Sequence, residues 1–499
     1  MSHADRLAYS RSRPCRVSEV PQWDFEADVL VVGFGSAGAS AALEARRAGA
    51  DVLLFEVTAA SGGTSALSGG EIYMGGHGGT PIQRHAGFSD DTEDFYRYLV
   101  MAGGPNADEA KCRAYADDCA EHYQWLVAQG VRYKNSFIKE RIVEPVTDDC
   151  LLWSGSEEAY PFSEHAKPCP RGHTPQWMGM GGGKYLMDVL AEQVNKAGVR
   201  VQYEARVIAL IAEDDNTVRG VVVKIDGVDR YARARGGVVL AAGGFIMNRD
   251  MVKKHAPMLL RAQYPLGTVD DGSGVQLGQS VGGAAINMSE GFVTLPWYPP
   301  ERLIRGIFIN ERGQRFINED CYHGRVSHHA LQQGGNRIFI LLDADSFGEP
   351  DFGQHFKITI GATGDTWDEV EAELDLPAGS LTSTVALYNR YAEQGQDPLF
   401  RKGAKWLKPL ATPPFVALDC RIDHALYTTF TMGGLDTSID GEVFDDTRRT
   451  IPGLYAAGRT TCGLPRWGEG YSSGMSLADA TYFGRRAGKR AAAAANAAR

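Results

Sequence analysis

Short apolar runs near the start of the chain are separated by a glycine turn and an alanine-rich segment. The first run, Val29–Val32, is followed directly by Gly33-x-Gly35-x-x-Gly38, and a second run ends at Glu56. A short apolar run without polar alternation is typical of a strand buried on both faces of a parallel sheet. The alanine-rich segment between the runs favours a helix. The pattern therefore predicts a β–α–β unit over residues 28–56.

Periodicity along the rest of the chain predicts further helices and strands. Helices are expected over residues 91–130, 185–197, 365–374 and 475–495, with a frayed alanine-rich end after Gly488. Strands are expected over residues 199–203, 205–211, 218–225, 237–245 and 453–458, the second and third as an antiparallel pair. Residues 150–185 are rich in Gly, Pro, Trp and Met, which predicts irregular structure over a cavity.

Strands that end in glycine are predicted near both ends of the chain, whereas the middle differs in composition and pattern. Residues 284–423 carry aromatic residues, charged loops and a helical stretch instead of nucleotide-domain signals. We therefore predict an α/β fold with a Rossmann-like nucleotide-binding domain in two parts, residues 26–283 and 424–499. The inserted residues 284–423 are expected to form an α+β substrate domain, and ligands commonly bind where two domains meet.

The glycine turn and the acidic residue after the second strand form a complete dinucleotide fingerprint. Gly33 permits a tight turn, Gly35 lets the backbone approach a pyrophosphate, and Gly38 lets helix and strand pack closely. The helix that starts after Gly35 offers N–H groups and a partial positive charge to phosphates. Glu56 can accept hydrogen bonds from ribose hydroxyls.

A second glycine-rich loop, Ser61–Gly70, follows the acidic strand end. A nicotinamide dinucleotide does not need such a loop, whereas a cofactor that extends past the pyrophosphate can use its N–H groups and small hydroxyls. A merely flexible loop is the alternative interpretation.

Composition narrows the class of protein. The 499 residues are 43% hydrophobic and 23% charged, which is ordinary for a globular protein of more than one domain. The net charge of −11 argues against nucleic-acid binding, and no apolar run reaches the length of about 18 residues needed for a membrane span. The first 15 residues are polar and lack the apolar core of a secretory signal, so a cytoplasmic location is expected.

No metal site is expected. The eight cysteines form no CxxC motif, which argues against zinc and iron–sulfur sites, and suggests reduced thiols. His323, His328 and His329 lack carboxylate-rich surroundings that would favour metal ligation.

Three further motifs follow the fingerprint in a recognisable order: Asp270–Gly274, the pair Gly433-Gly434, and Ile451–Gly458. With them, the chain resembles the FAD-dependent fumarate reductase and 3-ketosteroid dehydrogenase superfamily from about residue 26 to 490. The resemblance implies FAD, a Rossmann-like FAD-binding domain split by an inserted α+β capping domain, and a substrate held between the two. Non-covalent FAD is expected, because Thr64 stands where succinate dehydrogenase flavoproteins carry histidine. Arg459 replaces the glutamate that many relatives have after the last glycine motif.

The predicted cofactor-binding residues combine these motifs. They are Gly33, Gly35, Ser36, Ala37, Gly38, Glu56, Gly62, Gly63, Thr64, Ser65, Ser68, Gly69, Gly70, Val207, Ala242, Gly243, Asp271, Gly458, Arg459, Ser476 and Leu477.

The reaction is expected to depend on residues of the middle and last segments. Fumarate reductases of the superfamily place an arginine acid shortly after a segment that here reads Gly313–Glu319, and Tyr322 and His323 stand near that place, with Arg325 further along. Their second carboxylate clamp, Asn-Arg-Leu, is replaced by residues 467–477.

Tyr322, Tyr471 and Ser473 instead look like the 3-ketosteroid Δ4-(5α)-dehydrogenase branch. The resemblance implies that Tyr471 donates a hydrogen bond to the C3 oxygen and Ser473 accepts the C4 proton. Tyr322 would relay that proton towards solvent, while flavin N5 takes a hydride from C5. A hydrogen-bond donor at the ketone stabilises developing enolate charge, and serine needs the tyrosine partner because its alkoxide is inaccessible near neutral pH.

Other interpretations stay open at this stage. Tyr322 is one of 20 tyrosines and could be structural, and Tyr471 and Ser473 could be ordinary residues at a helix N-terminus. The rival functions are a 3-ketosteroid Δ1-dehydrogenase or enone reductase, a fumarate-type reductase of an unsaturated acid, and a non-catalytic flavoprotein. The expected partners are a small hydrophobic substrate and an electron acceptor; the sequence predicts neither this acceptor nor the oligomeric state.

Overall fold

The apolar strands from both ends of the chain meet in one large sheet. The structure is a computed structural model and describes residues 13–497, so the prediction for the polar N-terminus falls largely outside the described residues. The main path of the sheet runs in the order β1 (Cys15–Arg16), β8 (Ala205–Ala212), β9 (Val218–Ile225), β10 (Val228–Leu240), β2 (Phe25–Val32), β3 (Val52–Phe55) and β7 (Arg200–Gln202). Strand β21 (Thr450–Ala456) joins beside β10 and carries β20 (Glu442–Phe444).

Strand β10 belongs to two different parts of this sheet. Its first half pairs antiparallel with β9, and its second half runs parallel to β2 and β21. The pairing shifts between Ala234 and Gly237, where Gly237 has a φ of 136°. A Cβ at Gly237 would lie 2.5 Å from the carbonyl oxygen of Gly453, so only glycine allows this approach of β10 to β21. The sequence predicted only the second half of β10.

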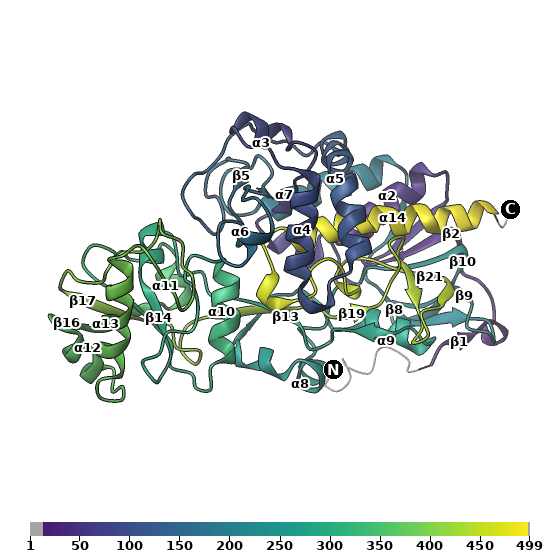
Figure 1. Ribbon diagram of the computed structural model, residues 1–499. Helices are drawn as coiled ribbons and strands as arrows, with labels where there is room; N and C mark the ends of the chain where they lie inside the picture. Colours follow the sequence, from purple (N-terminus) through teal and green to yellow (C-terminus); the bar gives the residue numbers. More distant parts are fainter. Residues whose placement is uncertain (1–12, 498–499) are drawn as a thin grey trace.

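The two faces of the parallel strands are covered by different layers. Val29 and Val31 face the helical layer, whereas Leu30 and Val32 face the β8–β9 hairpin and α9 (Ser273–Ser280). This accounts for an apolar run without polar alternation. The helical layer contains α2 (Ser36–Arg47), α7 (Gly182–Lys196) and α14 (Met475–Ala497), and α2 and α14 lie side by side although they come from opposite ends of the chain (Figure 1).

The helical stretch predicted over residues 91–130 is two helices. These are α4 (Thr92–Gly103) and α5 (Glu109–Gln129), capped by Asp91 and Asp108 and separated by the turn at Gly104–Asn106. Residues 150–185 are largely irregular, as predicted, and contain only the short elements β5 (Leu151–Leu152), α6 (Phe162–His165) and β6 (Gly172–His173) before α7 begins.

The prediction of a frayed end after Gly488 is wrong. Helix α14 continues to Ala497, and Ala491, Ala492 and Ala495 are fully buried. A Cβ at Gly236 of β10 would lie 2.4 Å from the carbonyl oxygen of Ala491, so this end of the helix lies directly on the sheet. The small alanine side chains that suggested disorder are what permits this close packing.

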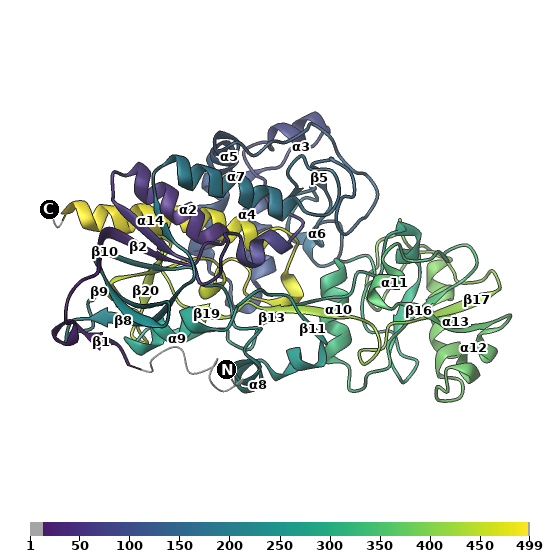
Figure 2. The same cartoon turned by 180° about the vertical axis from the view of Figure 1, so that it is seen from behind.

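The middle of the chain forms a smaller sheet, which is covered by helices and has a hydrophobic core of its own. Four strands pair antiparallel in the order β14 (Ile307–Ile309), β15 (Phe339–Leu342), β17 (Phe415–Asp419) and β16 (Thr359–Gly364). Helices α12 (Trp367–Glu373) and α13 (Ser380–Ala392) pack on this sheet. Figures 1 and 2 show this part to one side of the large sheet, with α10 (His323–Gln332) at the junction. The split fold is thus confirmed, while the boundaries at residues 284 and 423 stay predictions.

Two strands that flank the inserted segment pair with each other. Strand β13 (Gly291–Thr294) runs antiparallel to β18 (Thr428–Thr431), which also pairs with β11 (Tyr264–Pro265). The remaining helices and strands are short: β4 (Ile72–Tyr73), α3 (Pro81–His85), α8 (Arg249–His255), β12 (Ala285–Ile286), α11 (Gly353–Phe356) and β19 (Gly434–Leu435). Between residues 13 and 497, no helix is long and apolar enough to cross a membrane.

The burial of the end of α14 can be tested with two alanines that differ only in exposure. We expect Ala491→Asp to lower the free energy of unfolding by about 3 kcal/mol or more, because an unpaired charge would be buried. Ala493→Asp, on the exposed side of the same helix turn, is the control and should leave the melting temperature nearly unchanged. Equal melting temperatures for the two variants, measured by thermal unfolding, would contradict the packing described here.

Candidate active site

One continuous cavity of about 510 Å³ lies where the large sheet meets the inserted part. Its walls come from the turn between β2 and α2, the second glycine-rich loop, the end of β10, the loop before α9, the start of α10, strand β18 and the start of α14. Residues predicted for the cofactor and for catalysis therefore face the same space.

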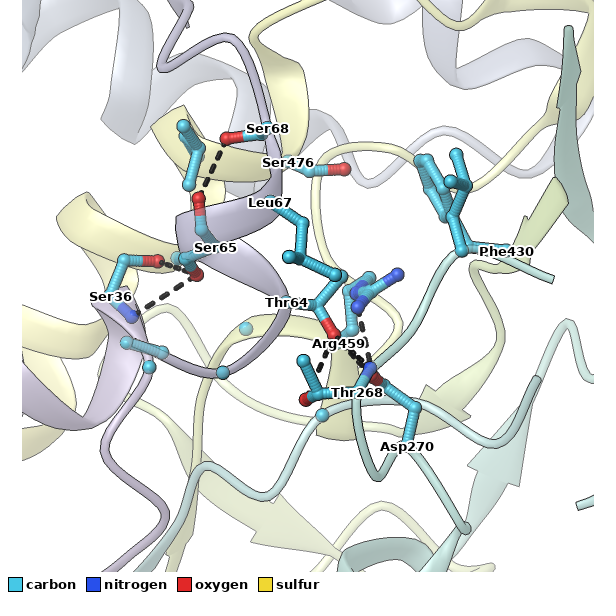
Figure 3. Close-up of a pocket in the computed structure, with 18 of the residues that line it drawn as sticks. Ser36, Thr64, Ser65, Leu67, Ser68, Thr268, Asp270, Phe430, Arg459 and Ser476 are labelled. Atoms are coloured by element: carbon cyan, nitrogen blue, oxygen red, sulfur yellow. Dashed lines mark hydrogen bonds and ion pairs between the residues drawn. The ribbon is translucent and has the colours of Figure 1, made fainter. Parts of the chain in front are cut away.

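The second glycine-rich loop docks onto the N-terminus of α2. The Ser36 N–H donates to Ser65 Oγ at 3.2 Å, and the two serine hydroxyls lie 2.9 Å apart (Figure 3). The N-cap residue Gly35 has no side chain to cover the first turn, and a Cβ there would meet only the Ser65 hydroxyl and the Gly62 carbonyl oxygen. This bare backbone suits the close approach of a pyrophosphate.

Glu56 is held in a fixed orientation at the end of β3. Its carboxylate accepts hydrogen bonds from the Phe34 N–H at 2.7 Å and from the N–H and hydroxyl of Thr58, both at 2.8 Å. The side chain is 5% exposed and lines the cavity. The geometry agrees with a carboxylate that binds ribose hydroxyls.

Asp270 joins three segments that are far apart in the sequence. It accepts hydrogen bonds from the Gly244 N–H at 2.9 Å, from Arg459 Nη2 at 2.8 Å and from the Thr64 hydroxyl (Figure 3). Arg459 also lies 4.9 Å from the centre of the Phe430 ring. The replacement of glutamate by arginine at position 459 is thus matched by an aspartate that pairs with it.

Four of the predicted cofactor-binding residues do not line the cavity. Asp271 pairs with Arg206 at 2.7 Å and accepts the Ser273 N–H at 3.0 Å, so it orients α9 beside the cavity while Asp270 faces inwards. Gly38, Gly62 and Gly70 lie just behind the wall, where they allow close backbone packing.

The structure brings Tyr322, Tyr471 and Ser473 together. The Tyr322 hydroxyl lies 2.7 Å from Ser473 Oγ, although the two residues are 151 positions apart, and the Tyr471 hydroxyl donates to Ser476 Oγ at 3.1 Å. Tyr322 precedes α10, and Ser473 lies in the turn that leads into α14. Ser154 holds this turn, since its carbonyl oxygen accepts the Ser473 N–H at 2.8 Å.

Aromatic side chains surround these hydroxyls. The ring of Phe292 lies 4.4 Å from that of Tyr471 and 4.9 Å from that of Phe430, measured between ring centres. Phe352 and Phe356 of the inserted part line the same cavity. The wall near the hydroxyls is therefore largely apolar and suits a hydrophobic ring system.

Burial keeps Tyr322, Tyr471 and His323 neutral. It raises the pKa of Tyr471 to about 12 and that of Tyr322 well above its ordinary value, and it lowers the pKa of His323 to about 3. Both tyrosines therefore remain hydrogen-bond donors near neutral pH, and His323 remains uncharged.

The cavity arginines are already paired with carboxylates. Among the described residues that line it, the arginines are Arg206, which pairs with Asp271, and Arg459, which pairs with Asp270. Arg325 lies outside the wall and pairs with Glu469 at 3.5 Å. No wall arginine is left to clamp a dicarboxylate within the part of the chain that is described.

Several residues that face the cavity were not among those predicted to bind the cofactor or to take part in catalysis. They are Asp270, Glu71, Glu144, His323, Phe430, Phe352, His355 and Phe356. Asp270 begins a recognised motif, Glu71 follows the second glycine-rich loop, and His323 follows Tyr322; these positions were the available signal. The burial of Glu71 depends on segments distant in the sequence.

Comparison with known proteins agrees with this geometry. Residues 28–473 match the family described as FAD binding domain. A solved structure of 3-ketosteroid-Δ4-(5α)-dehydrogenase from Rhodococcus jostii RHA1, in complex with 4-androstene-3,17-dione, is 42% identical with a TM-score of 0.90, over 96% of this chain and 99% of that chain.

Two curated proteins are similar along most of their length. The 3-oxo-5-alpha-steroid 4-dehydrogenase of Comamonas testosteroni is 28% identical over 506 residues, which cover 88% of this chain and 93% of that protein. The fumarate reductase (cytochrome) of Shewanella frigidimarina is 28% identical over 481 residues, which cover 93% of this chain and 77% of that protein.

The family match spans most of the chain, and the cavity is lined by a bare helix N-terminus, the carboxylate of Glu56 and the second glycine-rich loop. The protein is an FAD-binding oxidoreductase. The chain belongs to the family described as FAD binding domain, in the superfamily of fumarate reductases and 3-ketosteroid dehydrogenases.

Proposed function

We propose that the protein dehydrogenates a 3-ketosteroid and introduces the double bond between C4 and C5. The observation that carries this proposal is the hydrogen-bonded pair of Tyr322 and Ser473, with Tyr471 beside it, in the cavity that the cofactor loops also line. The similar Rhodococcus jostii enzyme has this activity in its name and was solved with a 3-ketosteroid.

FAD is held without a covalent bond in this proposal. The turn from Gly33 to Gly38 and the start of α2 bind its pyrophosphate, Glu56 binds a ribose, and Ser65 and Ser68 line the path beyond. The Thr64 hydroxyl donates a hydrogen bond to Asp270. When bound, FAD supplies the acceptor for the hydride that leaves C5.

Tyr471, Ser473 and Tyr322 have different roles in the removal of the C4 proton. Tyr471 turns its hydroxyl proton from Ser476 Oγ to the C3 oxygen and stabilises the negative charge that develops there as C4 loses its proton. The high pKa of Tyr471, about 12, keeps this donor protonated at neutral pH. Ser473 Oγ receives the C4 proton, and the Tyr322 hydroxyl, at 2.7 Å, orients Ser473 for this role.

The apolar wall supports a steroid rather than a dicarboxylic acid as substrate. Two carboxylates bound away from water would need unpaired cations, whereas Arg206 and Arg459 are already engaged by Asp271 and Asp270. A 3-ketosteroid has one polar oxygen at this end, which Tyr471 alone can satisfy. The Δ1-dehydrogenase and enone-reductase alternatives use the same substrate class and differ in the product.

The proposal also includes a cytoplasmic location and a separate electron acceptor. The cysteines from Cys112 onwards are buried thiols, which fits a reducing compartment such as the cytoplasm. The electrons that reach the flavin pass to an acceptor that is separate from this chain.

The proposal is tested by anaerobic mixing of the FAD-loaded protein with a 5α-3-ketosteroid and, separately, with succinate. We expect the steroid to bleach the flavin absorbance and to yield a Δ4-3-ketosteroid, identified by mass spectrometry and its ultraviolet spectrum. Succinate should leave the flavin oxidised. Bleaching by succinate alone would rule out the proposal, and a Δ1 product would support the alternative.

Substitutions at the hydroxyl cluster should separate catalysis from cofactor binding. We expect Tyr471→Phe and Ser473→Ala each to lower the rate of flavin reduction by the steroid about 10²–10³-fold, the cost of losing one well-placed group in a transition state. The flavin spectrum should stay that of the loaded wild-type protein. Tyr264→Phe, at a side chain 39% exposed and away from the cavity, is the matched control. Near-normal rates in both cavity variants would contradict the assigned roles.

A further inference from the structure

The C4 proton needs a final acceptor that neither hydroxyl of the Tyr322–Ser473 pair can be. Tyr322 is 3% exposed, and burial raises the pKa of its hydroxyl well above the ordinary value. Serine is a weaker acid still. Each hydroxyl can therefore pass a proton along a hydrogen bond, but neither is available as an anion near neutral pH.

A buried carboxyl group lies against the same serine. Glu71 precedes β4, is 7% exposed and lines the same cavity as Ser473, whose side chain is near enough to oppose the rise in the pKa of Glu71. The chain around Ser473 is in direct contact, since a Cβ at Gly474 would lie 3.2 Å from the carbonyl carbon of Glu71. One carboxyl oxygen, Oε1, is buried without a hydrogen-bond partner. A buried acceptor without a hydrogen-bond partner lowers the stability of the fold, and a catalytic role is one explanation for its presence.

The surroundings of Glu71 make it a stronger base than an ordinary glutamate. Burial raises its pKa well above the usual range, the neighbouring carboxyl groups of Glu144 and Glu157 raise it further, and the nearby side chain of Ser473 opposes the rise. The charge of Glu71 in turn raises the pKa values of Tyr322 and Tyr471. A raised pKa makes the Glu71 carboxylate a stronger proton acceptor than an ordinary glutamate.

A second carboxyl group, that of Glu144, lies near Glu71 and raises its pKa. Glu144 lines the cavity and packs against the loop before Glu71, where a Cβ at Gly69 would lie 2.8 Å from its carboxyl carbon. Residue 144 is partly exposed, whereas Glu71 is buried. Of the two carboxyl groups, that of Glu144 is therefore the one nearer to solvent.

We propose that Glu71 is the final acceptor of the C4 proton, reached through Ser473, and that Glu144 returns this proton to solvent. The inference rests on the proposed steroid dehydrogenation. As the C4–H bond breaks, its proton bonds to Ser473 Oγ, and the hydroxyl proton of Ser473 moves to the Glu71 carboxylate. The electron pair of the C4–H bond becomes the C4–C5 π bond, while the C5 hydride leaves to the flavin as oxidant. Tyr322 positions Ser473 for this transfer.

The test is the pH dependence of anaerobic flavin reduction by a 5α-3-ketosteroid in the wild type and in Glu71→Gln. In the wild type, the rate should rise with pH as Glu71 loses its proton. In the variant, the rate should fall about 10²–10⁴-fold, the usual contribution of a general base, and lose this rise. The control Glu157→Gln removes a buried carboxyl outside the cavity wall; it should retain the rise with pH, displaced to lower pH because Glu157 also raises the pKa of Glu71.

The outcomes separate the two proposals. A wild-type flavin that the steroid does not reduce would overturn the proposed function and this inference together. A reducible wild type with an unchanged rate and pH profile in Glu71→Gln would overturn this inference alone. If Glu71→Gln does not retain FAD, Glu144→Gln carries the test, because loss of a like charge should shift the rise to lower pH. An unshifted rise would then overturn the inference.

Discussion

The close approach of backbone to backbone at the start of α2 is the constraint on which the rest of the structure depends. A Cβ at Gly38 would lie 1.9 Å from the carbonyl oxygen of Gly33, and one at Gly33 would lie 2.4 Å from that of Ala241. On the opposite side, a Cβ at Gly484 would lie 2.5 Å from the carbonyl oxygen of Ala37. Strand β10, helix α2 and helix α14 therefore converge at one point. The cofactor turn and the turn that leads into α14 are built on this single scaffold.

A second point of convergence lies on the cavity wall at Asp270. This carboxylate binds the second glycine-rich loop through Thr64, the end of β10 through Gly244, and the last glycine motif through Arg459. Each partner satisfies part of a charge that is almost fully buried, which offsets the cost of removing it from water. Because Arg459 pairs with Asp270, its positive charge is already neutralised at the cavity wall. The shape of the cofactor site and the proposed preference for a neutral substrate thus have one physical origin.

The opposite end of the cavity combines hydroxyl groups, aromatic rings and one buried carboxyl. In such a dry setting, hydrogen bonds are strong and isolated charges are costly. Tyr322, Tyr471 and His323 consequently stay neutral, and they can orient and stabilise without gaining or losing a proton. Glu71 differs because its pKa is displaced towards the working range instead of away from it. A ketone substrate needs both kinds of group, a donor that stays protonated and an acceptor that does not.

The sequence by itself determined the split α/β fold, the dinucleotide turn and most of the cavity residues of the cofactor loops. These depend on short-range spacing, which a strand–glycine–helix pattern displays directly. Tertiary structure decided how β10 divides between two sets of partners and why the alanines after Gly488 are buried. It decided that Asp270 faces the cavity while Asp271 accepts the N–H of Ser273 at the start of α9. It also decided that Tyr322 and Ser473 meet and that Glu71 lies beside them. Each of these features is a contact between distant segments or a degree of burial, and neither quantity exists until the chain has folded.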